Sequence, residues 1–176
     1  MNKLNLGCGK DIKTGWINLD SVELPGVDIC HDLEALPLPF EDNTFDEVLC
    51  QSVLEHIHDY IPLLKDIHRI LKTGGKLSIL VPHFTSKNAY TDPTHIRYFA
   101  CRTFNFFTET HSHAYYFDFS FSKVASIHIN FEKQPLYFYN YILEPLVNLN
   151  ISTQTIYEDT PLRIFSALDI SFELIK

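Results

Sequence analysis

Short apolar segments alternate with polar stretches that contain glycine, proline or aspartate through the first half of the chain. These segments predict buried strands at residues 4–6, 16–19, 27–30, 45–50 and 76–81. One longer stretch has helical spacing, with apolar residues at Tyr60, Leu64, Ile67 and Leu71. The pair Gly74 and Gly75 predicts the end of this helix. Strands that alternate with helical stretches predict an α/β fold with a parallel sheet covered on both faces.

The pattern changes after Pro82. Residues 98–121 hold ten of the chain's 24 aromatic residues, and we interpret this segment as an insertion over the ligand-binding face. Beyond it, residues 124–131 and 168–175 read as strands, and residues 136–149 as a helix interrupted at Pro145. We therefore expect one domain over residues 1–176, with a cofactor half (1–82), the aromatic insertion (about 83–122) and a C-terminal part (123–176).

Composition and charge narrow the class of partner. The chain has 176 residues, 45% of them apolar, and a formal net charge of −8. Its first fifty residues hold ten acidic residues against three lysines, which disfavours nucleic acid as a substrate. No apolar run is long enough for a membrane span or a secretion signal, so we expect a cytoplasmic protein with no membrane partner.

The four cysteines form no C-x-x-C pair, which argues against a zinc ribbon or a redox motif. We expect reduced thiols at Cys8, Cys30, Cys50 and Cys101.

A glycine loop follows the first predicted strand, and an acid ends the second. Gly7 and Gly9 let a ligand approach the backbone closely, and Asp20 has the position to accept hydrogen bonds from ribose hydroxyls. Only nine residues, 7–15, separate the two strands, whereas a parallel crossover normally needs about a dozen or more. A pyrophosphate favours a helix N-terminus, so a ligand without phosphates fits this short crossover better.

Five segments in order resemble the class I S-adenosylmethionine-dependent methyltransferases over residues 3–82. They are L-N-L-G-C-G, the acid Asp20, H-D-L-E-A-L-P-L-P-F-E-D-N-T-F-D-E-V, S-V-L-E-H-I and L-K-T-G-G-K-L. The segments D-P-T-H-I-R-Y-F and A-L-D-I-S-F-E-L-I-K resemble a subgroup of small bacterial enzymes of this family. The resemblance implies a Rossmann-like, mostly parallel seven-stranded sheet in the order 3-2-1-4-5-7-6. It also implies an antiparallel last strand and helices on both faces, and the nine-residue crossover predicts that the first helix is shortened.

The resemblance also implies a cofactor, S-adenosyl-L-methionine, and residues that hold it. Asp20 would hold the ribose hydroxyls, and Asp32 and Leu33 would meet the adenine. Gln51 would approach the amino acid end or the sulfonium. The residues expected to line the methionine moiety are Leu6, Gly7, Cys8 and Gly9.

Two positions depart from the family pattern. Asn5 stands where the family has an acid in the first strand, so it keeps hydrogen bonding but loses charge. Asp11 stands in place of a third glycine, either as a substitute acid for the cofactor's ammonium group or as a solvated loop residue.

Methyl transfer requires an aligned nucleophile and, when that nucleophile is protonated, a base. Our first candidate base is His95, with Asp92 and Arg97 to orient it or bind an anionic substrate. The alternative is that His95 fixes the loop through a backbone carbonyl. His83, after the fifth strand, is a candidate for substrate contact, whereas Glu55 and His56 are expected to brace the structure.

Two H-x-H pairs occur, at His56 with His58 and at His111 with His113. A metal site needs a third or fourth ligand and no such spacing stands out, so we expect no metal.

The sequence thus predicts an enzyme that transfers a methyl group to oxygen or nitrogen of a small molecule or a glycan-type precursor. A non-catalytic partner subunit of the same fold stays open as an alternative. A nicotinamide oxidoreductase is disfavoured, because Ile12 occupies the third glycine position of the dinucleotide fingerprint. The sequence leaves the acceptor and the oligomeric state undetermined.

Overall fold

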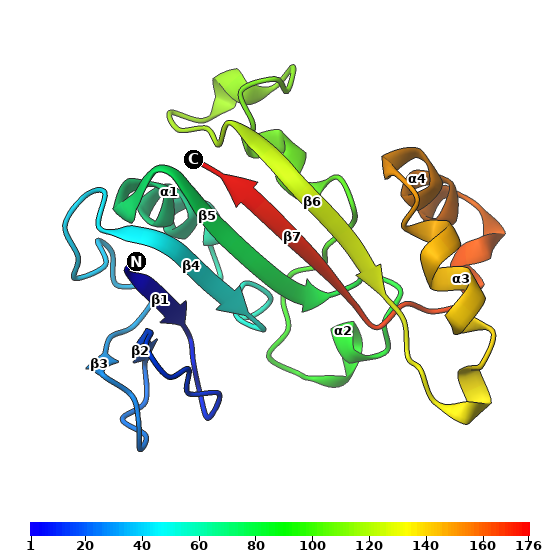
Figure 1. The fold of residues 1–176 in the computed structure, drawn as a ribbon, viewed down its shortest axis with the longest axis horizontal. Coiled ribbons are helices and arrows are strands. Elements are labelled where there is room, and N and C mark those ends of the chain that lie inside the picture. Colours follow the sequence, from blue (N-terminus) through cyan, green and yellow to red (C-terminus); the bar gives the residue numbers. More distant parts are fainter.

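Seven strands pair into one mixed sheet in the order β3-β2-β1-β4-β5-β7-β6 (Figure 1). The computed structural model describes residues 1–176. The strands are β1 (Lys3–Leu6), β2 (Ile17–Asp20), β3 (Ile29–Cys30), β4 (Phe45–Gln51), β5 (Leu71–Pro82), β6 (Lys123–Asn130) and β7 (Asp169–Ile175). The first five strands are parallel, and β7 is antiparallel to both β5 and β6. The strand order and the antiparallel last strand are therefore confirmed.

One face of the sheet forms the core. Alternate residues of each strand point to this face, and Leu6, Cys50, Ile79 and Phe172 are paired in one row across β1, β4, β5 and β7. All four side chains are essentially inaccessible to solvent. Burial of such a row contributes the largest favourable term to folding, roughly 1.5–3 kcal/mol for each fully buried large apolar side chain.

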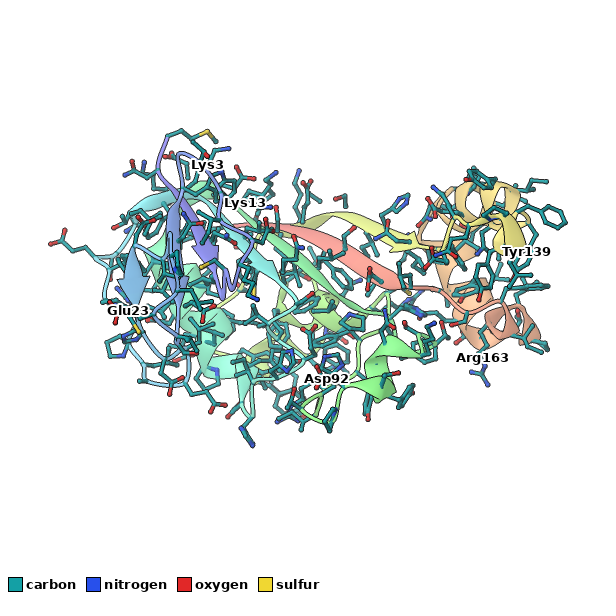
Figure 2. The ribbon with its side chains drawn as sticks, turned by 90° about the horizontal axis from the view of Figure 1, so that it is seen from below. Lys3, Lys13, Glu23, Asp92, Tyr139 and Arg163 are labelled. Atoms are coloured by element: carbon teal, nitrogen blue, oxygen red, sulfur yellow. The ribbon has the colours of Figure 1, made fainter.

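The opposite face of the sheet is polar and carries no helix (Figure 1). Glu47 pairs with Lys3 at 2.8 Å and with Lys76 at 3.1 Å, and Lys76 also pairs with Glu173 at 3.1 Å. Lys3 lies on this uncovered side in Figure 2. The expected helices on both faces are thus present on one face only, because the connections from β1 to β4 contain no helix.

Helix α1 (Tyr60–Ile70) covers the core face beneath β4 and β5. Its N-cap Asp59 accepts from Ile61 N, and the helix buries Leu63, Leu64, Ile67 and Ile70. The predicted helix is confirmed, but its predicted end is wrong. The chain enters β5 directly at Leu71, and the two glycines lie inside that strand.

The crossover between β1 and β2 forms an open loop without even a short helix. Two buried asparagines satisfy its backbone instead. Asn5 Nδ2 donates to Asp11 O at 2.8 Å, and Asn18 Oδ1 accepts from Lys13 N at 2.9 Å. The two amides are joined by a bond of 3.1 Å from Asn5 Nδ2 to Asn18 Oδ1. The predicted shortened helix is therefore absent, and side-chain amides hold the loop.

The aromatic segment packs beneath the sheet and continues the core. Phe99 and Phe104 stack at 5.8 Å, and Phe104 meets Phe172 of β7 at 4.7 Å. The segment contains two short 3₁₀ turns, η1 (Thr103–Phe107) and η2 (Ala114–Tyr116). Its buried rings fill space between α1 and β7.

The C-terminal helices α3 (Asn140–Val147) and α4 (Ile151–Asp159) pack at the free edge of β6. The Asn148 side chain accepts from Ile129 N and donates to Ile129 O, both at 2.8 Å. The short elements α2 (Asn88–Thr91), η3 (Pro135–Tyr137) and η4 (Pro161–Ile164) complete the fold. None of the helices has the length and apolar content that a membrane crossing requires.

Candidate functional site

Two adjoining cavities lie at the carboxyl edge of the parallel strands, where open α/β sheets bind ligands. The glycine-loop cavity has a volume of about 210 Å³ and is lined by Gly7, Asp20, Ser21, Asp32, Leu33, Ser52, Val53, His56 and Ile57. The histidine cavity has a volume of about 600 Å³ and is lined by Ser52, Glu55, His56, Pro82, Asn88, Thr91, Asp92, Pro93, His95 and Asp169. Ser52 and His56 line both cavities, so the two cavities adjoin.

The glycine loop requires glycine at Gly7. Its φ is +61°, and a Cβ added there would lie 2.4 Å from Val53 Cγ2, which is closer than any real contact. Gly9 has φ +50° and donates its N–H to Asp20 Oδ2 at 2.7 Å. The loop therefore turns tightly over the end of β1, and Gly7 packs directly against Val53.

The carboxylate of Asp20 connects the end of β2 to the glycine loop. Oδ2 accepts from Gly9 N, and Oδ1 accepts from Val22 N at 3.0 Å. Each carboxylate oxygen has two lone pairs, so each keeps one for a ligand hydroxyl. Across the cavity stand the exposed Asp32 and the buried side chain of Leu33. An acid beside a polar edge and an apolar wall is the arrangement that a nucleoside needs.

The other residues predicted to hold the cofactor line neither cavity. Leu6 is fully buried in the core, and Gln51 ends β4 half-buried. Cys8 is buried between the two glycines, and burial, followed by the charge of Asp20, raises the pKa of its thiol. Asp11 lies outside the site, where its carboxylate pairs with Lys13 at 2.7 Å. The solvated reading of Asp11 therefore fits its position.

In the histidine cavity, Glu55 is a buried carboxylate that has no partner. Its side chain is 1% exposed, and neither carboxylate oxygen has a hydrogen-bond partner. Burial, reinforced by the charges of Asp169 and Asp92, raises the pKa of the Glu55 carboxyl to about 7. The sequence predicts only a bracing role for Glu55. The feature that indicates another role is a charged residue within an apolar run.

His95 faces the same space. Its Nδ1 is buried without a partner, and its ring packs edge-on against the ring of His56 with centroids 4.7 Å apart. Asp92 Oδ2 lies 4.0 Å from His95 Nε2. Thr94 donates its N–H and its hydroxyl to Asp92 Oδ1 at 2.8 and 2.6 Å, and these bonds lower the pKa of Asp92. The segment that resembles the family thus forms one wall, and Figure 2 shows Asp92 near α2 on the covered side of the sheet.

The structure does not bring His83 and Arg97 into the site. His83 is fully buried, its Nδ1 accepts from Thr85 N at 3.2 Å, and its Nε2 therefore donates to Glu158 Oε1 at 3.0 Å. With both nitrogens engaged, His83 has no lone pair to offer a substrate. The exposed Arg97 reaches only the backbone oxygen of Ile57, at 3.5 Å. Asp169, which the sequence did not indicate, lines the histidine cavity instead. Burial raises the pKa of its carboxyl, and the charge of Glu132 raises it further.

Comparison with known proteins points to one family. Residues 4–79 match the family model described as "Methyltransferase domain". An uncharacterised protein of Methanocaldococcus jannaschii is 42% identical over 91 residues, which cover 44% of this chain and 39% of that protein. A demethylmenaquinone methyltransferase of Bacillus mycoides is 38% identical over 69 residues, which cover 39% of this chain and 29% of that protein. These matches thus span less than half the length of either relative.

The fold as a whole matches a solved structure. The crystal structure of a SAM-dependent methyltransferase from Archaeoglobus fulgidus superposes with a TM-score of 0.63 at 20% identity. The superposition covers 99% of this chain and 86% of that one. Residues 4–79 thus match a methyltransferase domain model, and the whole chain shares the seven-stranded fold of a solved SAM-dependent methyltransferase.

Proposed function

We propose that this chain transfers a methyl group from S-adenosylmethionine to oxygen or nitrogen of a small molecule or a glycan-type precursor. The observation that carries the proposal is the junction of the two cavities at Ser52 and His56. A nucleoside held in the glycine-loop cavity would lie next to the histidine cavity, where an acceptor has room beside His95.

The residues of the glycine-loop cavity fit the cofactor. Asp20 has one lone pair free on each oxygen for the two ribose hydroxyls, and Gly7 lines the same cavity without a side chain of its own. Asp32 and Leu33 line the wall suited to the adenine. The acidic first fifty residues favour a cofactor that carries a sulfonium and an ammonium. When bound, the cofactor supplies an electrophilic methyl group.

The histidine cavity supplies a base for the acceptor. In-line displacement needs the nucleophile aligned, water excluded and any proton removed. The unpartnered Nδ1 of His95 supports its role as the acceptor of that proton, and Asp92, 4.0 Å from Nε2, would stabilise the charged imidazole. No Lys or Arg lines the cavity, which favours a neutral or cationic acceptor over a phosphorylated one.

The same proposal includes the setting of the reaction. The net charge of −8 favours a small acceptor over nucleic acid. All four cysteines are free thiols, and free thiols persist in a reducing compartment, which supports a cytoplasmic location.

Turnover assays test this function. The chain, incubated with S-adenosylmethionine and a panel of phenols, amines and sugar hydroxyls, is expected to form S-adenosylhomocysteine with at least one acceptor class. His95→Ala is expected to slow turnover by about 10²–10⁴-fold with little change in cofactor affinity. His58→Ala, on a largely exposed histidine nearby, is the control that keeps wild-type turnover. Unchanged turnover of His95→Ala at saturating acceptor would return His95 to a purely structural role.

A further inference from the structure

We propose that Glu55, His56 and His95 form a binding site for a divalent first-row metal ion in the histidine cavity. One ligand atom from each of the three side chains lies within 4.8 Å of the other two. Metal bonds of about 2.0–2.2 Å place ligand atoms roughly 3–4 Å apart, so side-chain shifts of about an ångström close the site. The spacing of residues in the sequence did not predict this ligand set, because His95 comes from a loop far along the chain from Glu55 and His56.

The first argument is the unpartnered state of two buried groups. Both oxygens of Glu55 and the Nδ1 of His95 have no hydrogen-bond partner, and Glu55 is 1% exposed. A buried polar group without a partner costs free energy, and a buried carboxylate costs more. A cation between them would satisfy the carboxylate and the imidazole nitrogen at once.

The second argument is the orientation of His56. The hydroxyl of Thr94 donates to Asp92 Oδ1 at 2.6 Å, so its oxygen is left to accept from His56 Nδ1 at 2.8 Å. His56 therefore carries its proton on Nδ1, which leaves the lone pair of Nε2 free. A hydroxyl and a carboxylate behind the imidazole are the supports that metal-ligating histidines commonly have.

The third argument is the donor set and its surroundings. Two imidazoles and one carboxylate suit Zn²⁺ and neighbouring transition metals, whereas Mg²⁺ and Ca²⁺ favour all-oxygen sites. Asp92 and Asp169 add negative charge to the cavity wall. Three protein ligands leave at least one position open to water or to an acceptor. If the proposed function holds, that open position would bind the acceptor hydroxyl and lower its pKa, so the acceptor would lose its proton to water and the metal-bound Nδ1 of His95 would not act as the base.

Metal titration of the chain without cofactor or acceptor tests the site. Chelator-treated protein is titrated with Zn²⁺ by calorimetry, and Co²⁺ is added in parallel as a visible-absorption probe. We expect one tight Zn²⁺ site per chain. Affinity is expected to fall by about 100-fold or more in Glu55→Gln and in His95→Ala. Thr94→Val, which keeps all three ligands, is expected to lose about 10-fold.

The matched control is the double variant His111→Ala, His113→Ala, because these paired histidines lie outside the cavity. It is expected to keep the tight site. The Co²⁺ spectrum separates lost ligation from misfolding, since a variant with an unchanged far-UV dichroism spectrum but no d–d bands has lost ligands. Tight binding that persists in Glu55→Gln, binding abolished only in the double control variant, or no binding by the wild type would each overturn the proposal. None of these readouts depends on methyl transfer.

Discussion

At the scale of single residues, two side-chain amides hold the loop between β1 and β2, which contains no helix. Asn5 donates to Asp11 O and to Asn18 Oδ1, and both asparagines are buried. The sequence showed that Asn5 keeps hydrogen-bonding capacity while losing charge. It did not show that the partner would be a carbonyl of the chain's own loop, because that contact exists only once β1 and β2 pair.

Asp20 is the residue on which cofactor affinity is expected to depend most. Asp20→Ala removes the acceptor for the ribose hydroxyls and also the acceptor for Gly9 N, so it should weaken cofactor binding by about 1–3 kcal/mol. Calorimetric titration with S-adenosylhomocysteine measures the change. Asp11→Ala removes a carboxylate from the same loop but outside the cavity, and should bind as the wild type does. Equal affinities for wild type and Asp20→Ala would rule out the ribose contact.

Glu158 is expected to make stability depend on acid pH. Burial by itself would raise the pKa of this carboxyl, but hydrogen bonds from His83 Nε2, Cys101 Sγ and Cys101 N outweigh burial and hold the pKa below its ordinary value of 4.5. Because the folded-state pKa is the lower one, this stabilisation is complete above pH 4.5. It is lost as the pH falls through the folded-state value.

The variant Glu158→Gln separates this contribution from the rest. It should lower the free energy of unfolding at pH 7 by about 1–3 kcal/mol, since neutral Gln accepts weaker hydrogen bonds. It should also reduce the drop in stability between pH 5 and pH 3. Urea unfolding at several pH values measures both effects. An identical pH profile in wild type and variant would show that Glu158 is not the group responsible.

At the scale of elements, the edge strand β6 is closed by side chains. Asn148, which follows α3, bonds both Ile129 N and Ile129 O, and Gln154 of α4 donates to Ile127 O at 2.9 Å. These bonds satisfy backbone groups that an edge strand otherwise presents to other chains. The two helices therefore protect the sheet edge as well as packing beside it.

Asn148→Ala should accordingly lower the free energy of unfolding by about 1–3 kcal/mol, because it leaves the N–H and C=O of Ile129 without their partner. Hydrogen exchange at Ile129 N should accelerate in the same variant. Ser152→Ala, an exposed α4 position whose side chain makes no hydrogen bond, is the control and should change stability by less than about 0.5 kcal/mol. Unchanged exchange at Ile129 N would mean that the Asn148 side chain does not protect the edge of β6.

The glycine pair after α1 shows why element ends were harder to predict than elements. Glycine after an amphipathic stretch is a common helix end, but here Gly74 and Gly75 lie inside β5. Gly74 has φ +76°, and a Cβ at Gly75 would lie 2.8 Å from Lys72 O and 3.2 Å from Phe45 O. Close backbone approach between strands and a helix end both select glycine, so the residue type could not distinguish them.

At the scale of the whole molecule, the strand order was predictable because the family motifs occur in their usual order along residues 3–82. Which faces of the sheet are covered by helices could not be predicted. Glu47, Lys76 and Glu173 make one face polar, and the short connections between β1 and β4 leave it without helices. For the aromatic segment, composition shows that Phe99 and Phe104 need burial but not beneath which surface.

The two halves of the candidate site differ in the same way. Gly7, Asp20 and Asp32 could be placed from local motifs, since each follows or ends a predicted strand. Glu55 and Asp169 could not, because their proximity depends on β7 returning beside β5 from the far end of the chain. Sequence motifs thus located Gly7, Asp20 and Asp32 of the glycine-loop cavity, and tertiary structure added Glu55 and Asp169 to the histidine cavity.

The central claim is that the glycine-loop cavity holds S-adenosylmethionine, and parallel calorimetric titrations with S-adenosylmethionine and with NAD test it most directly. No helix follows the glycine loop, so no helix N-terminus is present there to bind a pyrophosphate. Asp20 can accept hydrogen bonds from the ribose of a ligand that has no phosphates. We predict that one S-adenosylmethionine binds per chain and that NAD does not bind. Binding of NAD, or failure of S-adenosylmethionine to bind the folded chain, would contradict the account.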